Sequence, residues 1–339
     1  MAGICTLAIL SDIHYASAAE QARGPDYEIA GIPNPLLRTF VALYRHFFWL
    51  RAPLSQNYLL ESFLEKGARF EYVVANGDYS CNSAFVGISD DAAAQSVQEC
   101  LGKLRRVFGG RLFATFGDHE LGKVSFFGGR GGMRLASWHR ARQELGLEPV
   151  WKLRLGKYVL IGVVSSLIAL PVFEPDTLPQ ERPEWHRLRA EHLHQIREVF
   201  DRIAPEERVL LFCHDPSALP FLRHEPTIGA RLPQIERTII GHLHSKLIFW
   251  KSRWLAGMPK INFLGHTAKR LSAALHQARD WRPFKVCLCP SLAGIELLKD
   301  GGYLTAALDP EARIPLKIEF HPLPRSRVNS PVPHRKLRS

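Results

Sequence analysis

The stretch RLFATFGDHELG, residues 111–122, is the most informative in the sequence, because it joins an apolar run to a cluster of acidic and imidazole groups. Its first half is typical of a strand buried in a sheet. The chain then turns on Gly117 and presents Asp118, His119 and Glu120 in a row. An α/β sheet carries its functional site at the carboxyl ends of its strands, so we expect such a site here.

Five further apolar runs of similar length predict strands. They are residues 4–10, 70–76, 158–164, 208–213 and 237–240. Helical patterns fall between them at 55–67, 89–110 and 183–203. Strands covered on both faces and alternating with helices predict an α/β fold with a layered core. Residues 286–309 are also expected to form strands, with a hairpin turn at 300–302.

The composition narrows the class of protein. A chain of 339 residues, 46% of them hydrophobic, buries a large core. The formal net charge of +11 favours an anionic partner, namely nucleic acid, an acidic membrane surface or a phosphorylated substrate. The six cysteines form no CxxC pair, so neither a zinc ribbon nor a disulfide framework is expected. The start lacks the basic region of a signal peptide and no apolar run reaches membrane-spanning length, so we expect a cytoplasmic protein.

Acidic and histidine side chains follow five of the six runs. They are Asp12 and His14, then Asp78, then Asp118 with His119 and Glu120, then His214, and finally His242 and His244. A single histidine of this kind is more often a satisfied core residue, but five converging strand ends are not explained in that way. Crowded carboxylates repel one another, and divalent cations relieve the repulsion. Mixed oxygen and imidazole ligands suit Mn, Fe, Zn or Co.

The blocks D-x-H, G-D, G-[N/D]-H-E, H and G-H-x-H occur in this order between residues 4 and 244, and they resemble the calcineurin-like metallophosphoesterase family. The resemblance implies a four-layer α/β/β/α sandwich and a hydrolase with two divalent metal ions, manganese being the expected metal. It implies that Asp12, His14 and His244 bind one metal, that Asp118, His214 and His242 bind the other, and that Asp78 bridges them. It also implies that His119 is a general acid or a clamp on the phosphate, and that Glu120 orients His119.

Asp118 departs from the family pattern, which has asparagine at this position. An ionised aspartate offers no N–H donor to a substrate phosphate and makes the centre more negative. Two explanations stay open. Either the aspartate is native and nearby cations replace the lost donor, or the sequence carries a replacement of asparagine that slows turnover.

Residues 34–53 form an apolar and basic segment. One helical stripe holds Leu36, Phe40, Leu43, Phe47 and Leu50, a second holds Leu37, Val41, Tyr44 and Phe48, and Arg38, Arg45 and Arg51 lie among them. A wide apolar face with bases is typical of a helix at a lipid surface, and a helix buried against the core is the alternative.

Two other segments bear on the substrate. Residues 245–285 carry nine Lys/Arg, one acid and six aromatic side chains, a pattern that suits stacked bases, an anionic lipid surface or a solvated basic face. Residues 122–134 contain Phe126, Phe127 and Arg130, and they are interpreted as an apolar lid or an ordinary loop.

We therefore expect one domain over residues 1–320, with insertions at about 16–54 and 245–285, and a basic, flexible tail at 321–339. The expected substrate is an amphiphilic phosphorylated molecule met at the cytoplasmic membrane surface, to which the protein binds peripherally. The resemblance extends to the enzymes of lipid A synthesis that cleave the pyrophosphate of UDP-2,3-diacylglucosamine into UMP and lipid 1-phosphate. The alternatives are a phosphodiesterase or nuclease acting on nucleic acid, a phosphoprotein phosphatase, and a binding scaffold without activity.

Overall fold

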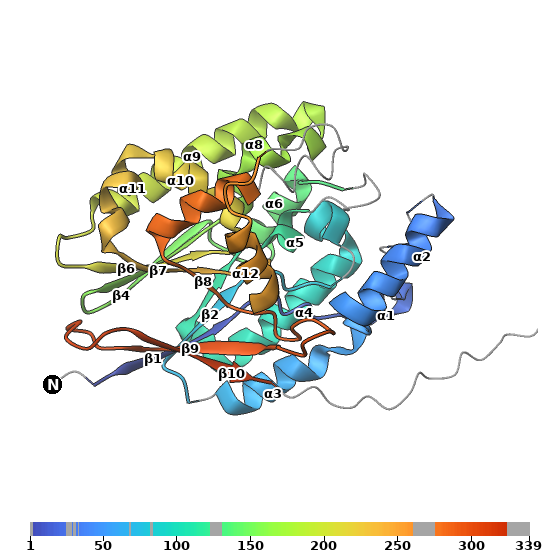
Figure 1. Ribbon diagram of the computed structural model, residues 1–339, viewed down its shortest axis with the longest axis horizontal. Coiled ribbons are helices and arrows are strands. Elements are labelled where there is room, and N and C mark those ends of the chain that lie inside the picture. The colour runs from blue at the N-terminus through green and yellow to red at the C-terminus, as the bar shows by residue number, and fades with distance from the viewer. Residues whose placement is uncertain are drawn as a thin grey trace, which may run out of the picture.

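Two five-stranded sheets pack face to face and carry helices on their outer faces (Figure 1). The computed structural model describes residues 3–24, 29, 32, 34–67, 69–81, 84–122, 131–259 and 275–323. The proposed lid residues Phe126, Phe127 and Arg130, and the tail beyond Leu323, lie outside the described residues.

The strands are β1 (Cys5–Leu10), β2 (Tyr72–Asn76), β3 (Leu112–Thr115), β4 (Val150–Leu155), β5 (Tyr158–Val163), β6 (Arg208–Cys213), β7 (Ile235–Ile240), β8 (Val286–Leu288), β9 (Gly302–Leu308) and β10 (Lys317–Pro322). The α-helices are α1 (Ala18–Arg23), α2 (Pro35–Tyr44), α3 (Asn57–Gly67), α4 (Asp91–Phe108), α5 (Asp118–Leu121), α6 (Leu135–Gln143), α7 (Ser165–Ile168), α8 (Leu170–Phe173), α9 (Arg182–Asp201), α10 (Leu219–His224), α11 (Pro226–Arg231) and α12 (Lys246–Trp254). A π-helical turn, η1 (Arg45–Trp49), continues α2, and a 3₁₀ segment, η9 (Ala278–Phe284), precedes β8.

The strand order sets where the carboxyl ends of the strands meet. The first sheet runs β10-β9-β1-β2-β3, with β1, β2 and β3 parallel and the other two neighbouring pairs antiparallel. The second runs β4-β5-β6-β7-β8, with only the β4–β5 pair antiparallel. The central parallel strands of both sheets therefore end at one edge of the molecule, which is where the sequence places its polar clusters.

Three apolar layers hold the sheets and helices together. Leu7, Ile9 and Phe212 pack in the layer between the two sheets. Helices α3 and α4 cover the outer face of the first sheet, and α9, α10 and α11 cover that of the second. The four-layer α/β/β/α sandwich expected from the sequence is thus confirmed, while the extent of the single domain stays a prediction.

All six apolar runs form strands, but the hairpin predicted at residues 300–302 is wrong. Strand β8 pairs with β7 in one sheet, whereas β9 pairs with β1 in the other. The carboxylate of Asp300 accepts hydrogen bonds from Ile295 N at 3.1 Å and from Ser245 Oγ at 2.7 Å. Asp300 therefore closes a loop between the sheets instead of a tight two-strand turn. Strand β10 includes His321 and Pro322, the first two residues of the predicted tail, and the extent of the tail stays a prediction.

Candidate metal centre

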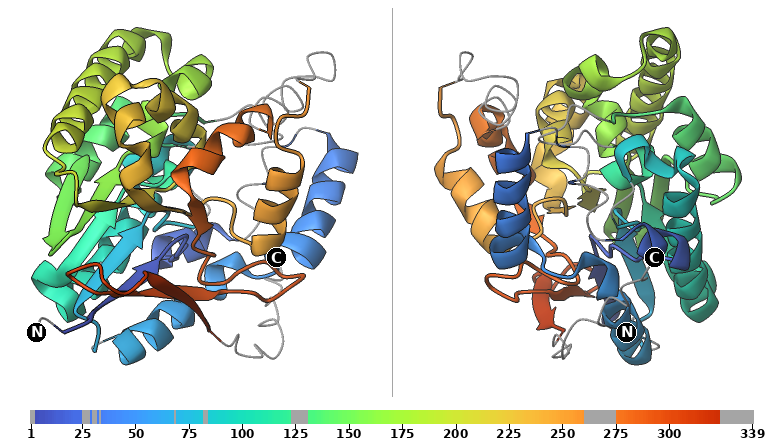
Figure 2. Two further views of the ribbon diagram at one scale, coloured as in Figure 1. Left: turned by 60° about the vertical axis from the view of Figure 1, so that its left-hand side comes forward. Right: turned by 90° about the vertical axis from the view of Figure 1, so that its right-hand side faces the viewer.

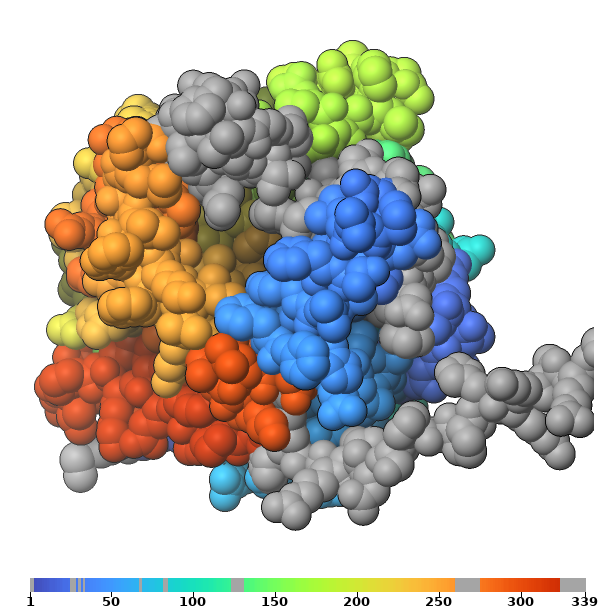
Figure 3. All heavy atoms as spheres, turned by 45° about the vertical axis from the view of Figure 1, so that its right-hand side comes forward, coloured from blue at the N-terminus to red at the C-terminus, as the bar shows by residue number. Residues whose placement is uncertain are grey.

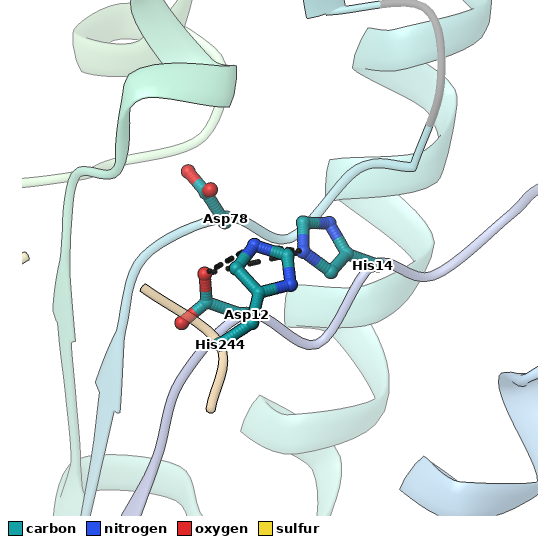
Figure 4. A group of neighbouring side chains, drawn as sticks. All are labelled: Asp12, His14, Asp78 and His244. Carbon is teal, nitrogen blue, oxygen red and sulfur yellow. Dashed lines mark hydrogen bonds and ion pairs between the residues drawn. The ribbon is translucent and has the colours of Figure 1, made fainter. Parts of the chain in front are cut away.

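Seven side chains from five strand ends form two overlapping clusters at the shared edge of the sheets. Asp12, His14, Asp78 and His244 form one cluster, and Asp78, Asp118, His214 and His242 form the other. Within each cluster, the possible ligand atoms lie within 4.8 Å of one another. Figure 4 shows the four side chains of the first cluster: Asp12 and His14 come from the loop after β1, Asp78 from the loop after β2, and His244 from the loop after β7. The structure thus brings together all seven ligands named from the sequence, with Asp78 shared as expected of a bridge.

The first cluster is compact. Nε2 of His244 lies 3.2 Å from Oδ1 of Asp12 and 3.4 Å from Nε2 of His14. Nε2 of His14 is 4.0 Å from the same Asp12 oxygen. Two imidazole nitrogens that face each other beside a carboxylate are suited to sharing one cation.

The second cluster centres on His214. Its Nε2 lies 3.2 Å from Oδ2 of Asp78 and 3.2 Å from Oδ1 of Asp118, and Nδ1 of His242 is 3.0 Å from that same Asp118 oxygen. This buried Nε2 makes no well-oriented hydrogen bond within the described part of the chain. Nδ1 of His214 is occupied by the backbone oxygen of Asn76, at 2.5 Å. A buried nitrogen between two carboxylates fits a metal ligand, so the residues present fit a cation here.

Ser80 fixes two of the histidines through its backbone oxygen, which lies 3.1 Å from Nδ1 of His14 and 2.9 Å from Nδ1 of His119. A carbonyl oxygen only accepts, so each Nδ1 carries the hydrogen and each Nε2 carries a lone pair when the ring is neutral. His14 is left ready to bind metal. His119 belongs to neither four-residue cluster, although its Nε2 lies 3.6 Å from Oδ2 of Asp78.

Glu120 fastens the loop after β2 to the loop after β3. Its carboxylate accepts hydrogen bonds from the backbone N–H groups of Asp78 at 3.1 Å, Tyr79 at 2.9 Å and Gly117 at 2.7 Å. The sequence predicted that Glu120 orients His119. In the structure, Nδ1 of His119 bonds to the backbone oxygen of Ser80, and Glu120 positions the loop that carries Asp78, so the orientation of His119 by Glu120 stays a prediction.

The backbone at the centre is strained. Five of the seven ligand residues have positive φ angles between 49° and 58°, namely Asp12, His14, Asp78, His242 and His244. Side chains other than glycine adopt this region at a cost, and such residues gather at functional sites. The loops also approach very closely: a Cβ on Gly241 would lie 2.0 Å from Ser11 Oγ and 2.5 Å from Asp12 Oδ2. The local fold is therefore shaped around the ligand positions.

The carboxylates make the centre strongly attractive to cations. Burial lowers the pKa of His242, but Asp118 outweighs it and raises that pKa to about 10. Burial likewise opposes protonation of His214, but Asp78 and Asp12 hold its pKa well above the ordinary value. The same negative potential favours divalent metal ions.

Sequence reasoning missed Ser80, Asn76 and Trp49. The first two act through backbone oxygens, which any residue carries, so no sequence pattern marks them. Trp49 lies in the segment predicted to meet lipid, yet its indole ring packs against the imidazole of His244 with centroids 4.7 Å apart.

The predicted substrate residues lie on α2, on η1 and in the turn after it, in the same segment as Trp49. Phe40 and Phe47 are exposed, and Phe48 is half-buried with its ring stacked on Tyr44. Arg38 donates two hydrogen bonds to the backbone oxygen of Ile32, at 3.0 and 2.7 Å. Arg45 is half-buried, and Arg51 is exposed with its backbone N–H directed at Glu296.

Two solved structures share part of this architecture. A dimetal phosphatase from Danio rerio aligns over 91% of this chain and 93% of its own, with 13% identity and a TM-score of 0.45. The phosphopantetheinyl hydrolase of Mycobacterium tuberculosis aligns over 72% of this chain and 84% of its own, with 15% identity and a TM-score of 0.33. No protein-family model and no curated protein sequence matches the chain. These likenesses are weak, so the function is inferred from the side chains of the centre.

Proposed function

We propose that the chain is a hydrolase of phosphoric esters or anhydrides that depends on two adjacent divalent metal ions, with manganese as the expected metal. The observation that carries the proposal is the pair of four-residue His/Asp clusters that share Asp78. Two adjacent cations in such a site polarise a phosphoryl group and lower the pKa of bound water. A scaffold without activity would not need five strained ligand residues around one point.

His119 is suited to proton transfer. Nδ1 of its ring is held by the Ser80 carbonyl, and Nε2 faces Asp78 without belonging to either cluster. With Nδ1 committed, the proton that His119 takes up or gives away sits on Nε2. His119 would protonate the oxygen of the leaving group or donate a hydrogen bond to the phosphate.

Asp118 bears on how strongly the centre attracts its substrate. The carboxylates of Asp12, Asp78 and Asp118 come close to neutralising two divalent cations. A centre with so little excess positive charge holds metal firmly but attracts an anionic phosphate less. Nearby basic side chains on other segments would then help to draw the substrate in.

We further propose an amphiphilic phosphorylated substrate, of which the UDP-2,3-diacylglucosamine implied by the sequence resemblance is one example. The support is the set of exposed apolar side chains on α2 and η1, which adjoin the centre through Trp49 and His244. A nuclease is the second candidate. It is favoured by exposed Trp250 and Trp254 among basic neighbours on α12, since aromatic faces among bases suit stacking with nucleotides.

Metal reconstitution tests the proposal. Protein stripped with chelator should regain hydrolysis of bis(p-nitrophenyl) phosphate with Mn, Fe, Zn or Co, and elemental analysis should find two metal ions per chain. Asp78→Asn should lose both the hydrolysis and the two metal ions. Ile314→Asp, on an exposed loop, is the control for a change in surface charge. Fewer than one metal per chain, or activity that survives the chelator, would contradict the proposal. Detergent-solubilised lipid pyrophosphate and single-stranded RNA, assayed side by side, separate the two substrate classes.

A further inference from the structure

Exposed apolar side chains are concentrated on one part of the surface. Eleven large apolar residues are exposed within the described residues, and nine of them lie on three segments. These nine, called the apolar rim below, are Leu36, Phe40, Leu43, Tyr44 and Phe47 on α2 and η1, Trp250 and Trp254 on α12, and Leu297 and Leu298 before β9. Leu36 is 81% exposed and Trp254 is 74% exposed, so these side chains contribute little to the core.

The three segments adjoin one another around the metal centre. The N–H groups of Glu296 and Leu297 donate to the backbone oxygens of Trp49 at 2.8 Å and Phe48 at 3.2 Å. Ser245, which caps α12, follows the ligand His244 directly and donates to Asp300. In Figure 2, α2 and α12 stand side by side, and Figure 3 shows a hollow between them. The apolar rim therefore surrounds an opening on the side of the ligand His244.

Among the described residues, the inner row of helix α2 packs against other apolar side chains, while its outer stripe faces solvent. Val41 packs with Ile29 and Ile32 in a small separate cluster, away from the main core. The side chains of the outer row, from Leu36 to Phe47, are exposed, whereas Leu50 at the end of the row is buried. A contiguous apolar surface of this kind marks an interaction site.

Two of the three segments of the apolar rim are positively charged, whereas the third carries Glu296, Lys299 and Asp300 beside its two leucines. Residues 34–53 and 245–258 together contain six Lys/Arg and no acidic residue. Beside Trp250 and Trp254 lies a cavity of about 650 Å³ lined by Arg237, Arg253, Arg282 and Lys285. No acidic side chain is among its described lining residues. This combination is complementary to a surface with anionic phosphate groups above an apolar interior.

The leucines favour lipid over nucleic acid. Single-stranded nucleic acid is bound by aromatic faces on which bases stack. Leu36, Leu43 and the pair at 297–298 offer no such face, and they gain free energy only by leaving water. Tryptophan, phenylalanine and leucine above basic residues are typical of proteins that lie in the interfacial layer of a bilayer.

We propose that the apolar rim docks onto an anionic phospholipid bilayer, so that the opening between α2 and α12 faces the membrane and receives the phosphorylated head of a lipid. This inference rests on the proposed function only for the identity of the substrate, because docking itself needs no metal. Docking places the leucines and aromatic rings among acyl chains, and exposed bases such as Arg51, Lys251 and Arg253 at the level of the phosphates.

Flotation with phospholipid vesicles tests the docking. The full chain should float with vesicles that contain about a third phosphatidylglycerol, and less well with phosphatidylcholine alone. Raising NaCl from about 0.05 to 0.5 M should weaken the binding without abolishing it, because the apolar part is not screened. Phe47→Asp should weaken it by about tenfold or more, and Ile314→Asp, at another exposed apolar residue away from the rim, should not. Thermal melting of both variants shows that they fold.

Protein that stays in solution with anionic vesicles overturns the inference. Two other results would also overturn it. One is binding to single-stranded RNA that Phe47→Asp abolishes while vesicle binding is unaffected. The other is a wild-type dimer that Phe47→Asp separates, together with no binding to vesicles. Hydrolysis of the soluble diester without vesicles reports on the proposed function separately. Vesicle binding without metal-dependent hydrolysis would leave docking standing and the proposed function overturned.

Discussion

The indole ring of Trp49 packs against the imidazole of His244, with ring centroids 4.7 Å apart and planes inclined by 40°. The π-helical turn creates this contact, because the Leu50 N–H reaches back to the Arg45 oxygen at 2.9 Å and widens the last turn of the helix. A residue of the apolar and basic segment thereby contacts a candidate metal ligand.

Removing this ring should loosen His244. Trp49→Ala is expected to weaken metal affinity by about tenfold or more, as loss of a group that orients a ligand does. Trp49→Phe, which keeps an aromatic ring, should bind metal nearly as the wild type does. Metal titration of stripped protein, read by activity and by calorimetry, measures the difference. Equal affinities for Trp49→Ala and the wild type would show that the ring contact does not position the ligand.

His119 is expected to act on the substrate without binding metal. His119→Ala should lower kcat by roughly 100-fold or more and leave the metal content unchanged, because general acid catalysis typically contributes that much. Its backbone N–H still bonds to Oδ1 of Asp78 in the variant, so the bridging carboxylate keeps that contact. Steady-state kinetics with elemental analysis checks both parts. Loss of metal from His119→Ala would make His119 a ligand.

Replacement of Asp118 by asparagine tests the charge of the centre. In the structure its Oδ1 lies between His214 and His242, so an amide oxygen would keep both contacts. Asp118→Asn should retain metal and raise turnover or tighten inhibition by inorganic phosphate, since the centre becomes more positive and gains an N–H donor. Lower activity with metal intact would show that the carboxylate is native and needed.

His192 should make the fold sensitive to acid. It is buried on α9, its Nε2 accepts a hydrogen bond from Val164 N at 3.1 Å, and burial lowers its pKa to about 3. Between pH 6.5 and 3 the unfolded chain binds a proton that the folded chain does not, so stability falls as the pH falls. The loss from this group at pH 5 is about 2 kcal/mol.

His192→Gln, whose Oε1 can accept the same hydrogen bond, should therefore lose about 2 kcal/mol less stability than the wild type between pH 7.5 and 5. Urea unfolding at the two pH values measures this difference. His194→Gln, on the exposed face of the same helix, is the matched control. The same pH dependence in the wild type and in His192→Gln would show that this imidazole is protonated in the folded protein.

The sequence predicts the strands and the ligands well because both leave local signals. An apolar run that ends in Asp12 or His242 marks a buried strand and a polar loop at once. Strand β4 was missed because residues between Val150 and Leu155 alternate with charged ones, as befits an edge strand. Which sheet β8 joins depends on its pairing with β7, which is distant in the chain, and no local sequence pattern encodes this pairing. The sequence likewise does not determine the exposure of α2, because an apolar stripe does not show what the helix packs against.

The five candidate ligand residues with positive φ angles lower the stability of the folded chain. Each costs about 1–2 kcal/mol relative to glycine, so together they cost an amount comparable to the whole stability of an ordinary domain. Replacing one of these residues by glycine would therefore stabilise the fold while removing a candidate metal ligand. Metal ions bound at the candidate centre would offset part of this cost, because they would stabilise only the folded chain.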